Sequence, residues 1–255
     1  MSRWLPFSCV DGPGNRLVLF LQGCNFRCPG CHNPHTMGLC DHCGDCVPGC
    51  PGRALAMQEG RVSWQAELCT HCDRCLDVCP RHASPKTRQM SVAEVLALLR
   101  RYGPLLTGVT VSGGEATTQL PFVIALFTAI KAAPDLARLT CLLDSNGSLG
   151  ETGWQRLLPV LASLQLLAQA GKLAEVRLLL VPGRSDFLDA TGALEEALTT
   201  FLLSLGPVPI RLNGFRHHGV RGEALSWPEA GSADLTVLAN ALKAKGFGSV
   251  MLPAI

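Results

Sequence analysis

The stretch RLVLFLQGCNFRCPGCHNP, residues 16–34, decides the fold, and the chemistry of the chain begins in it. Residues 16–23 form a short apolar run that ends at a glycine, which predicts a buried β-strand. The loop that follows carries Cys24, Cys28 and Cys31 in a C-x3-C-x2-C pattern. A cubane iron–sulfur cluster takes four thiolates. Three therefore leave one iron open to another molecule, which predicts a reactive cluster, with zinc binding or a chance spacing as the alternatives.

A second cysteine pattern, C-x2-C-x2-C-x3-C-P, occurs twice further along the chain, in residues 40–51 and 69–80. In bacterial two-cluster ferredoxins such a run gives three ligands to one cluster, and its fourth cysteine serves the other. The repeat predicts two electron-transferring 4Fe–4S clusters, with structural zinc as the alternative. The expected ligand sets are Cys40, Cys43, Cys46 and Cys79 for one cluster and Cys69, Cys72, Cys75 and Cys50 for the other.

The composition is that of a globular chain. Of its 255 residues, 47% are hydrophobic and 16% are charged, which excludes intrinsic disorder and leaves room for one α/β domain with a small insert. The net charge of +2 is too small to indicate nucleic-acid binding, so we expect no nucleic-acid partner.

No segment predicts a signal peptide or a membrane span. Residues 1–6 lack a basic start followed by an apolar run, and the apolar runs at 17–21 and 157–168 are too short to cross a bilayer. We therefore expect no membrane partner and a cytoplasmic location. Cysteines at these spacings in such a chain are metal ligands, whereas Cys141, in an apolar strand, is expected to be a core thiol.

Residues 37–89 differ from the rest of the chain, because they hold eight cysteines and few long apolar runs. They are predicted to be an inserted ferredoxin-like module, and residues 1–36 and 90–255 to form the main domain. After the insert, strands and helices alternate, beginning with a helix that Ser91 and Glu94 open as a capping box. Further strands are expected at 108–111, 139–143, 176–181, 208–212 and 249–252, and helices at 121–132, 154–170, 194–205 and 235–245.

Such repeated βα units predict a parallel sheet whose C-terminal edge carries the chemistry. The strands are too few for a closed eight-stranded barrel, so an α/β fold with a partial (β/α) barrel is expected.

The segment Asp11–Pro34 resembles the radical S-adenosylmethionine enzymes that activate glycyl radical enzymes. That family carries a Gly-Pro-Gly stretch, a strand, C-x3-C-x2-C and then His-Asn-Pro. Three later stretches are similar to its SGGE, DTNG and R…VPG motifs, in the same order, and the chain resembles the YjjW-like members of the family. These stretches are Ser112–Glu115, Asp144–Gly147 and Val181–Gly183 with Arg177 upstream.

The resemblance implies a partial barrel of the radical S-adenosylmethionine type, three 4Fe–4S clusters and S-adenosylmethionine as cofactor. Cys24, Cys28 and Cys31 would hold the catalytic cluster, and reductive cleavage of the cofactor would give a 5′-deoxyadenosyl radical. That radical would take hydrogen from a glycine of a partner enzyme, with a flavodoxin or ferredoxin-type protein as electron donor. The implied cofactor-binding residues are Gly30, His32, Ser112, Gly113, Gly114, Glu115, Asp144, Ser145, Asn146, Arg177 and His218.

Several of these roles have structural alternatives. Gly113 and Gly114 would let the backbone approach the methionine portion of the cofactor, or they form an ordinary strand-to-helix turn. Glu115 would pair with the cofactor's ammonium group, or it begins a helix. Arg177 would pair with a cofactor carboxylate, or it ends a strand in solvent.

The sequence departs from the family pattern at three places. Gly30 stands where the family often has an aromatic residue. One βα unit, with its D-x-K strand end, is missing near residues 160–164, so the barrel is expected to be one unit short. Arg216 takes the place of a late-strand histidine, with His217 and His218 beside it.

These departures keep two alternatives open. One is another radical S-adenosylmethionine chemistry, on a different protein or on a small molecule. The other is an iron–sulfur electron-transfer protein that lost catalysis with the missing βα unit.

Overall fold

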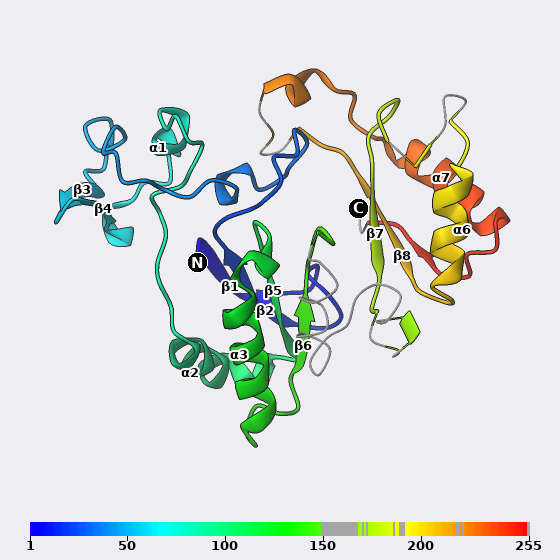
Figure 1. Cartoon of the computed structure of the whole chain (residues 1–255), viewed down its shortest axis with the longest axis horizontal. Helices are drawn as coiled ribbons and strands as arrows, with labels where there is room; N and C mark the ends of the chain where they lie inside the picture. The colour runs from blue at the N-terminus through cyan, green and yellow to red at the C-terminus, as the bar shows by residue number, and fades with distance from the viewer. Residues whose placement is uncertain are drawn as a thin grey trace. The chain divides into compact units, whose positions relative to one another are not determined.

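The computed structural model describes residues 1–148, 168–169, 171, 173–185, 187–188, 192–217, 220 and 222–253 (Figure 1). These residues form two compact units. The first contains Met1–Cys28 and Asn33–Ser148, and the second contains Pro29–His32 and the described part of Leu149–Ile255. No helix in this part of the chain is long and apolar enough to cross a membrane.

The first unit is built on a four-stranded sheet in the order β1-β2-β5-β6. Strand β1 runs antiparallel to β2, and the other neighbours are parallel. All six residues of β2 are buried, as a strand covered on both faces requires. The strands are β1 (Arg3–Ser8), β2 (Arg16–Leu21), β5 (Gly108–Gly113) and β6 (Thr140–Leu143).

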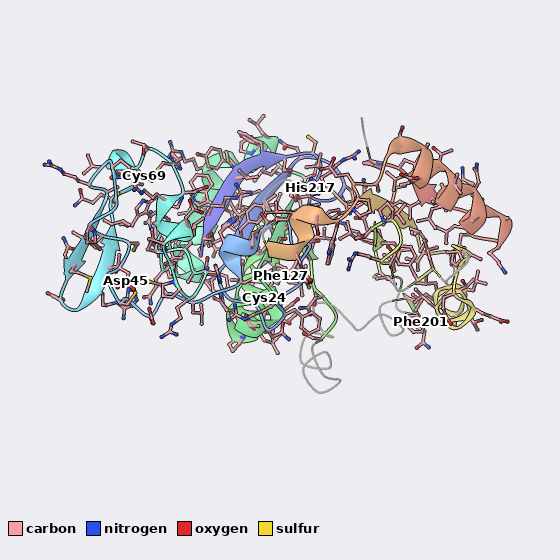
Figure 2. All side chains as sticks on the ribbon, turned by 90° about the horizontal axis from the view of Figure 1, so that it is seen from above. Cys24, Asp45, Cys69, Phe127, Phe201 and His217 are labelled. Carbon is pink, nitrogen blue, oxygen red and sulfur yellow. The ribbon has the colours of Figure 1, made fainter. Side chains whose placement is uncertain are left out.

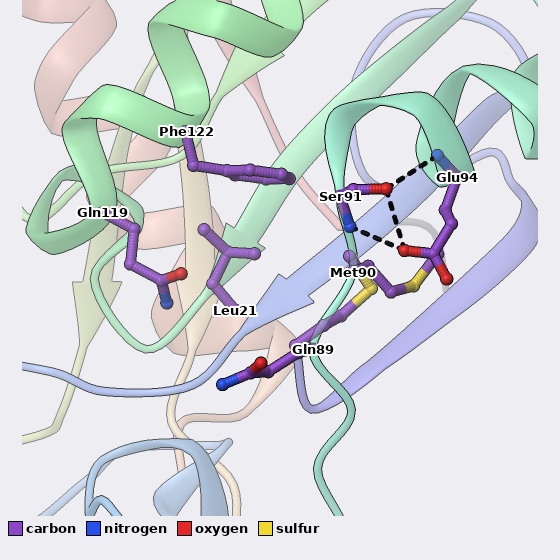
Figure 3. A pocket seen from close by; sticks show the side chains of 8 residues that line it. Leu21, Gln89, Met90, Ser91, Glu94, Gln119 and Phe122 are labelled. Atoms are coloured by element: carbon purple, nitrogen blue, oxygen red, sulfur yellow. Dashed lines mark hydrogen bonds between the residues drawn. The ribbon is translucent and has the colours of Figure 1, made fainter.

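Two helices of the same unit pack against each other (Figure 1). Helix α3 (Leu120–Ala132) buries Phe127 completely (Figure 2). Ser91 is the N-cap of helix α2 (Val92–Tyr102). Its side chain accepts a hydrogen bond from the backbone N–H of Glu94, and the Glu94 carboxylate accepts one from the backbone N–H of Ser91 (Figure 3). The predicted capping box is therefore confirmed. Short 3-10 helices lie at η3 (Gly103–Leu105) and η4 (Ala116–Gln119).

The cysteine-rich region contains little regular structure. Strands β3 (Leu55–Gln58) and β4 (Arg61–Trp64) form an antiparallel hairpin, and α1 (Arg74–Asp77) is a single short turn of helix. Two 3-10 helices, η1 (Pro34–Thr36) and η2 (Ala66–Leu68), complete it.

The second unit holds a three-stranded parallel sheet in the order β7-β8-β9. Its core gathers buried leucines and isoleucine from the strands and from α7, among them Leu178, Ile210, Leu212, Leu235 and Leu242. The elements are β7 (Val176–Leu180), α6 (Glu196–Ser204), β8 (Ile210–Gly214), η5 (Gly222–Ser226), α7 (Ser232–Ala244) and β9 (Val250–Met251).

The expected strands and helices of the described residues are confirmed, and the chain is a mixed α/β protein with several sheets. The helix expected at 154–170 lies outside the described residues except for 168 and 169, which are helical. Strand β1 was not predicted. Pro6 interrupts its pattern, and such a residue is tolerated because β1 is an edge strand with an irregular register between Leu5 and Ser8.

Candidate functional site

The loop after β2 begins the candidate site. The N–H of Gly23 donates to the carbonyl of Thr36 at 2.7 Å, and the N–H of Cys24 donates to the carbonyl of Met37 at 3.0 Å. Cys24 is half-buried and accepts an N–H···S bond of 3.4 Å from Phe26. Cys28 lies in the same unit as Cys24 and is exposed. Cys31 is half-buried and belongs to the second unit. The loop therefore leaves the sheet in a fixed direction.

Gly113 and Gly114 allow the end of β5 to pack directly against this loop. A Cβ at Gly114 would lie 2.1 Å from the carbonyl oxygen of Gly23, and one at Gly113, whose φ is +115°, would lie 2.3 Å from the backbone nitrogen of Leu21. Neither position can hold a side chain without moving backbone. In this structure the two glycines thus bring strand and loop together.

The carboxylate of Glu115 is buried, with 1% of the residue exposed. Its Oε1 accepts hydrogen bonds from the backbone N–H and the hydroxyl of Thr117 at 2.9 and 2.6 Å, and from Ser145 Oγ at 3.0 Å. Its Oε2 accepts one of 2.6 Å from the backbone N–H of Asn146. The side chain expected to face the cofactor's ammonium group is therefore bonded to the chain itself, and it joins the end of β5 to the turn after β6.

The turn after β6 is also linked to the cysteine loop. Asn146 Nδ2 donates to Asn25 Oδ1 at 3.1 Å, and Asn25 Nδ2 donates to Ser148 Oγ at 2.7 Å. The backbone N–H of Asp144 donates to Val111 on β5 at 3.0 Å. The predicted residues Ser112–Glu115 and Asp144–Asn146 are thus brought together at the C-terminal edge of the sheet.

Gly30 and His32 belong to the second unit, where aromatic rings surround them. A Cβ at Gly30 would lie 3.2 Å from the ring of Phe215 and 3.5 Å from that of Trp227. The ring of His32, which is exposed, lies 6.4 Å from that of Phe215. The rings of Phe215 and Trp227 therefore occupy the space into which an aromatic residue at position 30 would extend.

Arg177 lies within a charged cluster on β7 and β8. Its Nε donates to Glu175 Oε1 at 2.5 Å, and Arg211 Nε donates to Glu175 Oε2 at 3.0 Å. Burial disfavours the ionised form of Glu175, but the hydrogen bonds from both arginines outweigh it and hold the pKa of this carboxyl below its usual value. Arg177 is therefore fixed by a local carboxylate.

The late-strand basic residues lie around Glu229. The backbone N–H of His217 donates to the Glu229 carboxylate at 2.6 Å, and its ring Nε2 lies 2.8 Å from the carbonyl of Trp227. Arg216 lies 3.8 Å from the same carboxylate. His218 lies outside the described residues.

The four cysteines predicted to hold the second ferredoxin cluster line one small cavity. Trp64 and Leu55 of the hairpin close its apolar side, and Lys86 and Asp73, which form an ion pair, lie at its polar side. Burial disfavours the charged form of Lys86, but the hydrogen bond and charge of Asp73, together with the nearby thiolates of Cys75 and Cys69, outweigh it, so the pKa of this ammonium group is raised. The cysteines are Cys50, Cys69, Cys72 and Cys75.

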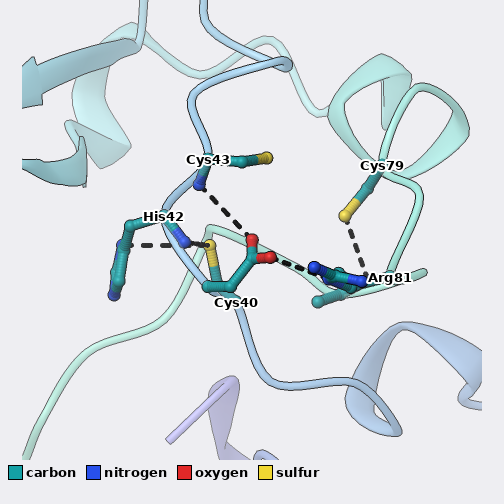
Figure 4. Close-up of polar contacts among 7 residues, drawn as sticks. Cys40, His42, Cys43, Cys79 and Arg81 are labelled. Carbon is teal, nitrogen blue, oxygen red and sulfur yellow. Dashed lines mark hydrogen bonds and ion pairs between the residues drawn. The ribbon is translucent and has the colours of Figure 1, made fainter.

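The other predicted ligand set is joined across the two runs. Arg81 Nε donates to the carboxylate of Asp41 at 2.7 Å, which ties the start of the first run to the end of the second (Figure 4). Burial, together with the neighbouring thiolates of Cys75, Cys40 and Cys79, raises the pKa of Cys46 to about 11. Cys75 and Cys79 of the second run thus both act on the thiol of Cys46 in the first.

The two runs also repeat one backbone conformation. The third residue of each run has a positive φ, 60° at His42 and 55° at His71. After each Cys-Pro pair a backbone N–H returns to the cysteine sulfur, from Ala54 to Cys50 at 3.3 Å and from Ala83 to Cys79 at 3.4 Å. Such N–H···S bonds stabilise thiolates. The sequence repeat is thus also a structural repeat.

All thirteen cysteines are described and none forms a disulfide. In the described residues no group of three His, Cys, Asp or Glu side chains is arranged around a single metal ion. A cubane cluster binds each thiolate to a different iron, so its ligands lie further apart than those of one ion.

Two larger cavities lie in the first unit. One of about 510 Å³ adjoins Ser91, Gln119 and Phe122 and contains no predicted site residue (Figure 3). The other, of about 1100 Å³, is lined by both Cys24 and Cys40. No aspartate or glutamate is among its described lining residues, whereas three arginines are, at positions 27, 61 and 88.

Comparison with known proteins agrees with this chemistry. Residues 10–143 match the model of a family described as a 4Fe-4S single cluster domain. The benzylsuccinate synthase activating enzyme of Thauera aromatica is 31% identical over 94% of this chain and 88% of the relative. The chain belongs to the family of glycyl radical enzyme activating enzymes. It is therefore a radical S-adenosylmethionine enzyme, a family whose cofactors are a 4Fe–4S cluster and S-adenosylmethionine.

Other activating enzymes match over shorter stretches. The pyruvate formate-lyase-activating enzyme of Streptococcus mutans is 34% identical over 49% of this chain and 32% of the relative. The choline trimethylamine-lyase activating enzyme of Oleidesulfovibrio alaskensis is 33% identical over 49% of this chain and 46% of the relative. The Thauera match runs over 297 positions, more than the 255 residues of this chain, so that relative has positions that this activating enzyme lacks.

Three residues that contribute to the site of this activating enzyme, Asn25, Lys86 and Phe215, were not predicted from the sequence. Asn25 lies inside the cysteine motif, where the spacing drew attention only to the cysteines. Lys86 and Phe215 reach their places through tertiary contacts, which no local pattern indicates. The cysteine spacing could have identified Asn25, because it is the polar residue next to a ligand.

Proposed function

We propose that this activating enzyme works with three 4Fe–4S clusters, one at the loop after β2 and two in the insert of residues 37–89. Cys24, Cys28 and Cys31 hold the catalytic cluster and leave one iron for S-adenosylmethionine. When bound, cluster and cofactor supply the reductive cleavage that produces a 5′-deoxyadenosyl radical for hydrogen abstraction from a glycine of the partner. The observation that carries the proposal is the near full-length match to an activating enzyme together with the family's motifs in order.

The protein's part in this reaction is to orient and shield. The ends of β5 and β6 present backbone and side-chain polar groups at the edge of the sheet where the cysteine loop begins. Gly113 and Gly114 keep strand and loop in contact, and Glu115 fixes the turn at Ser145 and Asn146. We further propose that the strands of both units belong to one partial (β/α) barrel that is one βα unit short.

The insert relays electrons to the catalytic cluster. One of its clusters is held by Cys40, Cys43, Cys46 and Cys79, and the ion pair between Asp41 and Arg81 supports this set. The other is held by Cys50, Cys69, Cys72 and Cys75, and the cavity that they line supports it. The donor is an acidic protein of the flavodoxin or ferredoxin type. The arginines around the cavity beside Cys24 and Cys40 support a negatively charged donor.

Anaerobic reconstitution tests the function. The reduced chain with three clusters is expected to carry about twelve irons and to form 5′-deoxyadenosine from S-adenosylmethionine, and a glycyl radical signal should follow when a partner enzyme is added. Cys28→Ser should abolish product. Cys72→Ser should keep the catalytic cluster and slow its reduction. A fully loaded chain that forms no 5′-deoxyadenosine would contradict the proposal and favour an electron carrier.

A further inference from the structure

Asn25 connects the cysteine loop to the turn after β6 by two hydrogen bonds of its side-chain amide. Its Oδ1 accepts from Asn146 Nδ2 at 3.1 Å, and its Nδ2 donates to Ser148 Oγ at 2.7 Å. We propose that Asn25 is a positioning residue, which holds the cysteine loop at a fixed distance from the 144–148 turn. This inference rests on the proposed function, because it concerns how the two halves of the cofactor site are spaced.

The turn is a rigid partner for Asn25. Its own backbone is fixed by the buried carboxylate of Glu115, which accepts from the N–H of Asn146 at 2.6 Å and from Ser145 Oγ at 3.0 Å. Asn146 Oδ1 also accepts from the N–H of Ser148 at 3.0 Å, and Ser145 Oγ accepts from the N–H of Gly147 at 3.1 Å. A carboxylate that is 1% exposed and makes four hydrogen bonds holds its partners firmly.

The start of the loop is held to the sheet by backbone hydrogen bonds. Cys24 is held by its N–H to Met37, and Gly23 accepts from the N–H of Glu115 at 2.8 Å. Asn25 is the next residue, and it is exposed, as are Phe26, Arg27 and Cys28 after it. Its amide is therefore placed where the loop leaves the sheet, between Cys24 and Cys28 of the motif.

The spacing between loop and turn matters because S-adenosylmethionine would be bound by both parts of the site. A cofactor bound to the open iron and to the strand ends must satisfy both at once, and sites of this kind need positions held to about 0.5 Å. An amide suits the task, because it donates to one partner and accepts from the other. Aspartate has the same shape but lacks the N–H that reaches Ser148.

The test compares three variants with a matched control in the reconstituted full-length chain. Asn25→Ala removes both bonds, Ser148→Ala removes the bond to Ser148 Oγ, and Asn25→Asp removes the N–H that donates to it. The control, Asn15→Ala, removes an amide that donates to the carbonyl of Leu105 at 2.8 Å at the opposite edge of the sheet. For each protein we would measure the iron and sulfide content and the KM and kcat for 5′-deoxyadenosine formation. We would also record the electron paramagnetic resonance spectrum of the reduced cluster with and without S-adenosylmethionine.

We expect Asn25→Ala to keep its clusters and to lose most of the spectral change on cofactor addition. Its KM for S-adenosylmethionine should rise about tenfold with a smaller change in kcat, since two net hydrogen bonds are lost. Ser148→Ala should shift both readouts in the same direction by less. Asn25→Asp should lie between Asn25→Ala and the parent.

Other outcomes overturn the inference. If the unsubstituted enzyme is active and Asn25→Ala and Ser148→Ala give the same readouts as Asn15→Ala, the link does not position the cofactor. Loss of the catalytic cluster in Asn25→Ala or Ser148→Ala would assign the pair to cluster assembly instead. A parent that carries three clusters but shows neither a spectral change with S-adenosylmethionine nor product would refute the proposed function, and the inference with it.

Discussion

Arg16 Nε donates a hydrogen bond of 2.6 Å to Thr110 Oγ1 in the interior of the first sheet. Arg16 is 1% exposed, and the same guanidinium donates to the carbonyl of Val109 at 2.7 Å and to Thr140 Oγ1 at 2.8 Å. One side chain therefore joins β2, β5 and β6. Burial lowers the pKa of Arg16, and among the described ion pairs none includes it, so neutral oxygens solvate its charge.

We expect Arg16→Ala to lower the free energy of unfolding by about 3 kcal/mol or more, because it takes the donor from two buried oxygens of β5, Thr110 Oγ1 and the carbonyl of Val109, and opens a cavity. Denaturant unfolding measures this change. Arg100→Ala is the control, since it breaks an exposed pair with Asp135 and should change the free energy of unfolding little. Equal losses in the two variants would mean that the buried guanidinium does not hold the strands together.

Local patterns predicted the elements that carry the site but not the contacts between them. Apolar runs and cysteine spacing were sufficient for β2, the loop after it and the repeated insert motif. The partner of Glu115 could not be predicted, because a carboxylate after a strand is equally suited to a cofactor, a helix start or a neighbouring turn. Phe215 packs against Gly30 from 185 residues away, and only the folded chain brings the two together.

Glu175 gives the second unit a pH-dependent stability. It lies between Arg177 and Arg211, which face each other across β7 and β8. Because its pKa is lowered in the folded chain, its contribution is present at neutral pH and above its unfolded pKa, and is lost as the pH falls through the folded value. Glu175→Gln should therefore reduce the melting temperature at pH 7 and have little effect in strong acid. A difference that stays constant with pH would contradict this assignment.

Lys86 should raise the reduction potential of the cluster proposed at Cys50, Cys69, Cys72 and Cys75. Its side chain is 15% exposed at the cavity that these cysteines line, and a nearby cation stabilises the more negative, reduced cluster. Lys86→Met is expected to make that potential more negative in a redox titration followed by electron paramagnetic resonance, and Lys86→Arg to preserve most of it. Lys131→Met is the control, because the ammonium group of Lys131 donates hydrogen bonds to the carbonyls of residues 137 and 139 instead. An unchanged potential in Lys86→Met would remove the lysine from any role at this cluster.

Arg27 and Arg61 should determine how fast an acidic donor reduces the enzyme. Both line the cavity beside Cys24 and Cys40, and neither belongs to an ion pair among the described residues. Arg27→Glu combined with Arg61→Glu should slow reduction by a flavodoxin about tenfold at low ionic strength, because opposite charges steer the encounter. The difference from the parent should shrink as salt screens the surfaces. Arg53→Glu is the control, because it makes one such charge change in the insert outside this cavity. If it slows reduction as much per substitution, net charge and not this cavity governs the encounter.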